Sequence, residues 1–315
     1  MTSGASPEGE DEAHSAPRTR GKDALRASLS SRGIAPQKKF GQNFMIDTNF
    51  AAAVARDSAP GAGVLTLEIG PGTGCLTRAI LDSDPQARVL AIEIDRGLAA
   101  LLREEFAEPI ESGRLSLLEG DALASKHELE PEFVAAALGI STRENRPRRV
   151  LCANLPYNAA TPLLANMSAD AQRLDMHSAV VTVQLELAQR MFGSAGTGDY
   201  GALTAFMAAR TDGAIIRRIG TEIFWPRPGV DSAVIRVEFL PFADEQGADT
   251  PRLRRSEAHD FQLFLQKLFS QRRKTLRAAL RPLLMPVDST VPPQSRAEDL
   301  EPAILLNLFR QTRPR

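Results

Sequence analysis

Short, largely apolar runs with the composition of strands alternate with helix-like segments through the middle of the chain. The runs that we expect to form strands are 64–69, 89–94, 115–118, 149–153, 179–184, 214–219 and 234–240. Most of the early runs lack polar alternation, which is typical of parallel strands that are covered on both faces. Helical stretches between them, such as 97–106 and 200–210, predict right-handed crossover connections. The pattern predicts a doubly wound, Rossmann-like α/β sheet within residues 34–240.

The part of the chain before this sheet has a different amino-acid composition. Residues 1–33 are rich in Ser, Gly, Pro and charged residues, with few apolar residues to bury, so we expect a disordered tail. Thr48 is expected to cap a helix that carries Phe50 and Val54 and ends before Pro60. The folded part of the protein is therefore expected to begin near residue 34.

After residue 240 the strand-like runs stop and apolar positions recur at helical spacing. These positions are Phe261, Phe264, Leu265, Leu268, Leu276 and Leu280. A further helix is expected at about 303–310, beyond a segment that several prolines interrupt. The pattern predicts a small all-helical domain over residues 241–315.

Composition narrows the class of protein. The chain has 315 residues, of which 43% are hydrophobic, enough for one large and one small core. No run approaches the roughly 18 apolar residues of a membrane span, and the acidic start lacks the apolar segment of a secretory signal. The cysteines Cys75 and Cys152 match no zinc or redox spacing. We expect a cytoplasmic protein with reduced thiols and no metal site.

The charge is close to balanced but unevenly distributed. A net charge of −1 by itself argues against a nucleic-acid-binding protein. Two basic zones stand out, however. The first comprises Arg18, Arg20, Lys22, Arg26, Arg32, Lys38 and Lys39, and the second Arg252, Arg254, Arg255, Lys267, Arg272, Arg273, Lys274, Arg277 and Arg281.

A glycine-rich turn follows the first predicted strand, in the sequence VLTLEIGPGTG at residues 64–74. Glycines such as Gly70 and Gly72 let the backbone turn sharply and approach a ligand at the carboxyl edge of the sheet. A dinucleotide fingerprint would have glycine in place of Cys75. Glu68 would repel a pyrophosphate, but it suits a cationic ligand that carries an amino group and a sulfonium.

Acidic residues follow the next two strands. Glu93 stands where a carboxylate can accept hydrogen bonds from both ribose hydroxyls, and Asp121 could accept one from an adenine amine. Together with Gly70, these strand ends predict a binding site for S-adenosylmethionine. The alternative is that the acids are ordinary helix caps, which is the interpretation we favour for Asp95.

The fourth strand ends in Asn154-Leu155-Pro156-Tyr157. The amino group of adenine is a poor nucleophile because its lone pair is conjugated with the ring. Two acceptors, the Asn154 side-chain oxygen and the Leu155 carbonyl, would hold the amine protons and favour the pyramidal nitrogen that attacks a methyl sulfonium. The ring of Tyr157 would stack on the base, as enzymes that modify extruded bases require.

Taken together, five segments of the sequence resemble the rRNA adenine N6,N6-dimethyltransferase family, and most closely its bacterial small-subunit branch. They are KKFGQNF (38–44), LEIGPGTG (67–74), NLPY (154–157), FWPRPGVDSAV (224–234) and SQRRKTL (270–276). The resemblance implies a class I methyltransferase domain followed by a helical RNA-binding domain. It also implies S-adenosylmethionine-dependent dimethylation of two adjacent adenines in the 3′-terminal hairpin loop of 16S rRNA, within a pre-30S particle late in ribosome assembly.

The resemblance also assigns roles to particular residues. Asn43 and Met45 would contact the cofactor, together with Glu68, Gly70, Gly72, Glu93, Asp121 and Asn154. Phe224 would form the second face of a base sandwich with Tyr157, although an aromatic residue between prolines is often simply core. RNA contacts are expected at Lys38, Lys39, Arg272, Arg273 and Lys274. For the basic run at 271–276 the alternative is the solvated face of an amphipathic helix. Leu185, Ala202 and Gly229 lack the positive charge that the family often carries at their positions.

Two other functions remain open from the sequence. One is an Erm-type adenine dimethyltransferase of 23S rRNA, which Leu155 disfavours because that branch tends to have isoleucine there. The other is a non-catalytic assembly factor that holds an immature subunit, which the intact Asn-Leu-Pro-Tyr turn disfavours. We expect the protein to be a monomer.

Overall fold

The computed structural model describes residues 22–140, 148–171, 173–241, 253–271, 273–281, 291–292 and 294–311. Its centre is a seven-stranded sheet. The strands are β2 (Val64–Ile69), β3 (Arg88–Glu93), β4 (Leu115–Glu119), β7 (Arg148–Asn154), β8 (Met176–Gln184), β9 (Thr211–Ile219) and β11 (Ser232–Phe239). Each coincides with a predicted run, so the expected α/β fold is confirmed.

The strand order of this sheet is β4-β3-β2-β7-β8-β11-β9. Strands β4, β3, β2, β7 and β8 pair in parallel, whereas β11 pairs antiparallel with both β8 and β9. From β2 the chain adds strands in one direction, and from β7 it adds them in the other. The switch point of the topology therefore lies between β2 and β7, where open α/β sheets bind their ligands.

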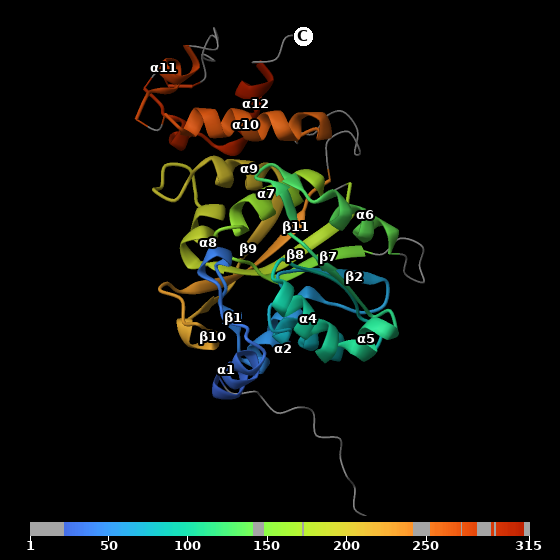
Figure 1. Ribbon diagram of the computed structural model, residues 1–315. Helices are drawn as coiled ribbons and strands as arrows, with labels where there is room; N and C mark the ends of the chain where they lie inside the picture. The colour runs from blue at the N-terminus through green and yellow to red at the C-terminus, as the bar shows by residue number, and fades with distance from the viewer. Residues whose placement is uncertain are drawn as a thin grey trace, which may run out of the picture.

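Helices cover both faces of the sheet (Figure 1). On one face lie α2 (Thr48–Ser58), α3 (Cys75–Ser83), α4 (Arg96–Glu105) and α5 (Ala107–Glu111). On the other lie α6 (Pro131–Gly139), α7 (Ala160–Asp170), α8 (Leu185–Met191) and α9 (Ala202–Arg210). The start of α2 corrects one prediction, because Asp47 is the N-cap and its side chain accepts a hydrogen bond from the Phe50 amide. A small hairpin of β5 (Leu123–Ser125) and β6 (Glu128–Leu129) precedes α6.

The prediction of a disordered tail over residues 1–33 is wrong for its last part. Lys22–Ser31 form helix α1, although residues 1–21 lie outside the described residues. Leu25 and Leu29 are buried against Leu98 and Leu101 of α4. Two leucines four residues apart form one apolar face, and this weak pattern is hidden by the polar residues around it.

A short two-stranded pair joins distant parts of the chain. β1 (Phe44–Met45) pairs antiparallel with β10 (Phe224–Trp225), so that Phe44 is opposite Trp225 and Met45 is opposite Phe224. The Phe44 and Trp225 rings lie 6.2 Å apart between centroids. The pair brings two of the motifs recognised in the sequence into direct contact.

The C-terminal segment is helical, as expected. Helices α10 (Ala258–Phe269), α11 (Leu276–Leu280) and α12 (Pro302–Gln311) lie at the top of Figure 1, beyond α7 and α9. Their apolar residues join the hydrophobic cluster on the α7/α9 face of the sheet, so one continuous core connects them to the sheet. The Arg310 guanidinium forms an ion pair with the buried Glu257 at 3.0 Å and holds the pKa of that carboxyl below its usual value. None of the helices in the described ranges is long and apolar enough to cross a membrane.

Candidate active site

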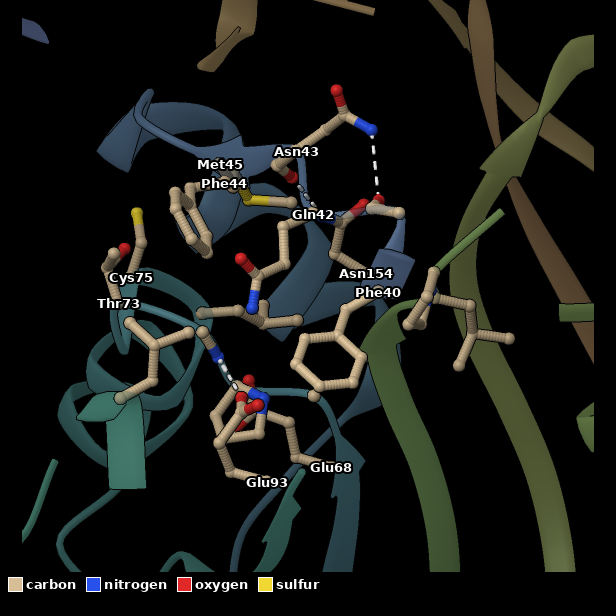
Figure 2. Close-up of a pocket in the computed structure, with 18 of the residues that line it drawn as sticks. Phe40, Gln42, Asn43, Phe44, Met45, Glu68, Thr73, Cys75, Glu93 and Asn154 are labelled. Atoms are coloured by element: carbon tan, nitrogen blue, oxygen red, sulfur yellow. Dashed lines mark hydrogen bonds between the residues drawn. The ribbon is translucent and has the colours of Figure 1, made fainter. Parts of the chain in front are cut away.

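A cleft lies at the carboxyl ends of β2, β3 and β7, at the switch point of the sheet. The cleft opens to solvent, and its space amounts to about 660 Å³ when the open mouth is counted, of which about 70 Å³ can hold the centre of a water molecule. Its walls come from the glycine turn after β2, the residues that follow β3 and β7, and residues 40–45 of the N-terminal segment. Figure 2 shows Glu68 and Glu93 together at the bottom of the view, with Asn43, Met45 and Asn154 above them.

The glycine turn wraps around the bottom of this cleft. Gly70 and Gly72 have φ angles of 66° and 61°, which glycine adopts without strain. The Gly72 amide donates a hydrogen bond to Glu93 Oε2 at 2.9 Å, and the Asp95 amide donates to Glu93 Oε1 at 2.9 Å. Glu93 therefore holds the turn in place, and its oxygens keep further acceptor capacity toward the cleft. Burial raises the pKa of this carboxyl.

Glu68 is the most perturbed acid of the cleft. Its side chain is 1% exposed and accepts a hydrogen bond from the Thr77 hydroxyl at 2.7 Å. Burial and the neighbouring Glu93 carboxylate raise its pKa from 4.5 to about 8. The carboxyl is therefore neutral at pH 7 in the unliganded protein, and a cationic group placed beside it would favour the carboxylate.

Asn154 faces the cleft from the end of β7. Its Nδ2 donates to the Asn43 carbonyl at 2.9 Å, whereas its Oδ1 is buried and has no hydrogen-bond partner. An unpaired buried acceptor is costly, so this oxygen is suited to accept a hydrogen bond from a ligand. The Leu155 amide is fixed by the Thr182 carbonyl at 3.1 Å, and no hydrogen bond between described residues uses the Leu155 carbonyl. Neither of the two acceptors expected from the sequence is used by another described residue.

Sequence reasoning missed how residues 37–43, here called the N-terminal arm, are held over the cleft. The Gln37 side chain donates to Asp95 Oδ2 at 2.7 Å, and the Gln42 side chain donates to the same oxygen at 3.3 Å. Between these two glutamines, the Lys39 carbonyl accepts a hydrogen bond from the Asn158 side chain at 3.3 Å. Asp95 is also the N-cap of α4, as favoured from the sequence. The only sequence signal for this arrangement was the glutamine within KKFGQNF.

The two aromatic residues of the predicted base sandwich have different surroundings. Tyr157 is half-buried and lines the cleft. Phe224 is buried among Met45, Ala51 and their neighbours and does not line the cleft. Because it pairs with Met45, which does line the cleft, Phe224 is next to the site without opening into it. Its role as the second face of a sandwich stays a prediction.

Asp121 is placed differently from the other predicted cofactor contacts. It is exposed, it is not among the residues that line the cleft, and its side chain accepts a hydrogen bond from the Leu123 amide. This turn-forming bond is a common use of an aspartate after a strand. The adenine contact proposed for it therefore stays a prediction, whereas Asn43, Met45, Glu68, Gly70, Gly72, Glu93 and Asn154 are brought together in one cleft.

The basic residues predicted to contact RNA lie in two places. Lys38 and Lys39 belong to a single helical turn, Lys38–Phe40, beside the cleft, and Lys39 is exposed with its Nζ 4.5 Å from the Phe40 ring centroid. Arg273 and Lys274 are exposed in the turn between α10 and α11. Arg272 lies outside the described residues.

We expect Gly74→Ala to destabilise the protein, because Gly74 has a φ of 80° and an added Cβ would lie 2.8 Å from Phe106 Cζ and 3.0 Å from Leu102 Cδ2. The strain and overlap should lower the free energy of unfolding by about 2–4 kcal/mol. Urea denaturation measures this loss. Gly196→Ala is the matched control, since Gly196 has a φ of 81° and open space around it. Equal losses of unfolding free energy in the two variants would show that overlap of the added Cβ with Phe106 contributes nothing.

The sheet order and the cleft at its switch point define the fold of a class I methyltransferase. Two solved structures support the fold. A dimethyladenosine transferase from Plasmodium falciparum is 21% identical, with a TM-score of 0.60 over 84% of this chain and 97% of that one. The 23S rRNA methyltransferase ErmE is 23% identical, with a TM-score of 0.55 over 86% of this chain and 99% of that one.

The chain belongs to the ribosomal RNA adenine dimethylase family, whose model matches residues 35–309. A relative from Chlorobaculum parvum, named ribosomal RNA small subunit methyltransferase A, is 36% identical over 284 residues, or 89% of this chain and 91% of the relative. A relative of the same name from Leifsonia xyli is 38% identical over 255 residues, or 80% of each chain. The resemblance seen in the motifs is confirmed, and the protein is an S-adenosylmethionine-dependent rRNA adenine dimethyltransferase.

Proposed function

We propose that this protein dimethylates N6 of two adjacent adenines in the 3′-terminal hairpin loop of 16S rRNA, acting as a monomer on a partly assembled small subunit. Support for the small subunit comes from relatives at 33–38% identity that carry the small-subunit name. Support for the chemistry comes from one observation above all, the buried and unpaired Oδ1 of Asn154 at the edge of the cleft.

The residues of the cleft fit the cofactor that the family uses. When bound, S-adenosylmethionine supplies a methyl group on a positively charged sulfur, which leaves as a neutral thioether. Glu68 would face its ammonium group, and Glu93 would accept from the ribose hydroxyls. Gly70 and Gly72 leave room for close approach of the ligand because they carry no side chain, and their positive φ angles favour glycine at both positions. Asn43 and Met45 would close the cleft from the N-terminal arm and β1.

Asn154 and Leu155 would act on the target amine. Asn154 Oδ1 and the Leu155 carbonyl accept its two N–H groups, which draws the nitrogen toward a pyramidal geometry and aims its lone pair at the methyl group. The positive charge forms on nitrogen, which becomes acidic and loses its proton to water, so no general base is required before attack. Positioning supplies most of the rate.

The same two acceptors account for two rounds of methylation followed by release. A monomethylated amine keeps one N–H, so one of the two oxygens still binds it. A dimethylated amine has no N–H, and both oxygens lose their partner. Because leaving a buried acceptor unpaired is costly, the doubly methylated base is held least well.

Contacts outside the cleft would position the RNA. Lys39 beside the cleft and Arg273 and Lys274 near the start of α11 are exposed cations that can contact phosphates without reading sequence. In this arrangement the ring of Tyr157 stacks on the extruded base. The RNA backbone is thus bound by residues that do not contact the reacting amine.

The substrate is tested with purified protein, labelled cofactor and ribosomal subunits from cells that lack the modification. We expect methyl transfer to small subunits and primer-extension stops at two adjacent adenines near the 3′ end of 16S rRNA. A stop only in 23S rRNA would show an Erm-type enzyme instead. No transfer to either subunit, with the cofactor still bound, would favour an assembly factor without catalytic activity.

A further inference from the structure

The hydroxyl of Tyr157 contacts the central sheet. It lies 2.8 Å from the hydroxyl of Ser232, the first residue of β11. Ser232 is 0% exposed, so the bond is shielded from water at one end, and Tyr157 itself is half-buried. The ring of Tyr157 lines the cleft, and its far end is therefore fixed by a buried side chain from another strand.

Ser232 is a rigid anchor because strands hold it on both sides. It pairs with Gln184 of β8 and with Ile219 of β9. The carbonyl of its neighbour Asp231 accepts a hydrogen bond from the Leu185 amide at 2.9 Å. The backbone of Ser232 is thus fixed by the sheet, and its hydroxyl has a fixed position relative to β7.

Ser232 also lies on the segment that carries Phe224. That segment begins with β10, where Phe224 is opposite Met45 of the cleft, and continues into β11. One stretch of chain therefore contacts both sides of the cleft, at Met45 and at Tyr157. The turn that carries Asn154 is joined to the sheet twice, through Leu155 to Thr182 of β8 and through Tyr157 to Ser232 of β11.

We propose that Ser232 is a positioning residue for methyl transfer, which holds the ring of Tyr157 at the angle at which it stacks on the target base. This proposal rests on the proposed function, because it assumes that the ring receives an adenine. Ser232 does not line the cleft and acts only through Tyr157. Loss of the bond lets the ring turn about its side-chain torsions, so the base arrives in a less productive position.

The test compares Ser232→Ala, Tyr157→Phe and the double variant. Each removes the same hydrogen bond while keeping the ring. We expect each to lower kcat/KM for the RNA by about 3- to 10-fold, the range of a single neutral hydrogen bond, with cofactor affinity unchanged. The double variant should lose no more than either single variant, because residues that share one bond are not additive.

A second readout does not require activity. The chain has two tyrosines, Tyr157 and Tyr200, so ¹³C-labelled tyrosine gives two signals by NMR, and Tyr157→Phe assigns them. Burial raises the pKa of Tyr157, and the bond from Ser232 partly offsets this rise. Ser232→Ala should therefore raise the pKa of Tyr157 further and leave the Tyr200 signal in place.

Ser168→Ala is the matched control for loss of a buried serine. Ser168 is 0% exposed on α7, and its hydroxyl contacts Met207 Sδ at 3.4 Å, outside the cleft. Its variant should keep the wild-type kcat/KM. Wild-type activity in Ser232→Ala, multiplied losses in the double variant or an unchanged Tyr157 titration would overturn the proposal. Failure of the proposed function is distinguishable, since wild-type protein would then not methylate small subunits at all.

Discussion

Asn154→Ala is expected to reduce methyl transfer about a hundred- to a thousandfold, comparable to the removal of a preorganised group that acts on the reacting atoms. The variant removes Oδ1, the buried acceptor that has no partner in the unliganded protein. It also removes the Nδ2 bond to the Asn43 carbonyl, so cofactor affinity should weaken modestly. Transfer to small subunits and calorimetric binding of the cofactor, measured side by side, separate these two effects.

Asn154→Asp separates loss of the Oδ1 acceptor from loss of the Nδ2 bond to Asn43. Aspartate has nearly the same size as asparagine and keeps the acceptor but not the donor. A carboxylate cannot donate to the Asn43 carbonyl and would repel it, which loosens the N-terminal arm. We expect this variant to bind the cofactor more weakly than Asn154→Ala does. Normal methyl transfer by Asn154→Ala would contradict the role assigned to this residue.

The affinity for S-adenosylmethionine is expected to rise with pH, by up to about tenfold per unit, until it levels off near pH 8. The reason is that Glu68 is protonated below its pKa of about 8, whereas the cationic cofactor favours the carboxylate. Binding at pH 7 should therefore release close to one proton from this group. Calorimetry in buffers of different ionisation enthalpy measures the released proton directly.

Glu68→Gln provides the control, because glutamine has the shape of the neutral acid and does not titrate. The variant should bind the cofactor more weakly at pH 8 and lose most of the pH dependence between 6 and 8. A wild-type pH profile in Glu68→Gln would show that another group carries the proton.

The stability of the unliganded protein should respond to Glu68 as well. Since its folded pKa lies above the ordinary 4.5, the folded state binds the extra proton. The protonated Glu68 carboxyl contributes fully to the free energy of unfolding below pH 4.5. This contribution is lost as the pH rises toward about 8, so the free energy of unfolding falls by about 1.4 kcal/mol per pH unit in that range. Urea denaturation at several pH values measures this effect in wild type and in Glu68→Gln. The difference between their free energies of unfolding removes the contributions of Glu93 and other acids, which the two proteins share.

The sequence by itself determined the elements and the chemistry at their ends. All seven central strands overlap predicted runs, and the inner strands such as β2 and β3 were the clearest, because a strand covered on both faces is apolar along most of its length. The edge strand β9 is largely exposed and carries Asp212, Arg217 and Arg218. The glycine turn, Glu93 and Asn154 were recognisable because each stands directly after such a run. A residue at the end of a strand can be recognised from its neighbours in the chain, so one sequence is enough to find it.

Only the tertiary structure decided which of these ends meet. The order β3-β2-β7 places the glycine turn beside Asn154, and this neighbourhood depends on strand pairing between residues 64–67 and 148–151. Contacts between residues far apart in the chain have no local pattern, so the N-terminal arm on Asp95 and the bond from Tyr157 to Ser232 were invisible in the sequence. Helix α1 was missed because its two buried leucines form too weak a local pattern, and they are buried only through contact with α4. That Asp121 lies outside the lining of the cleft could likewise be seen only in the tertiary structure.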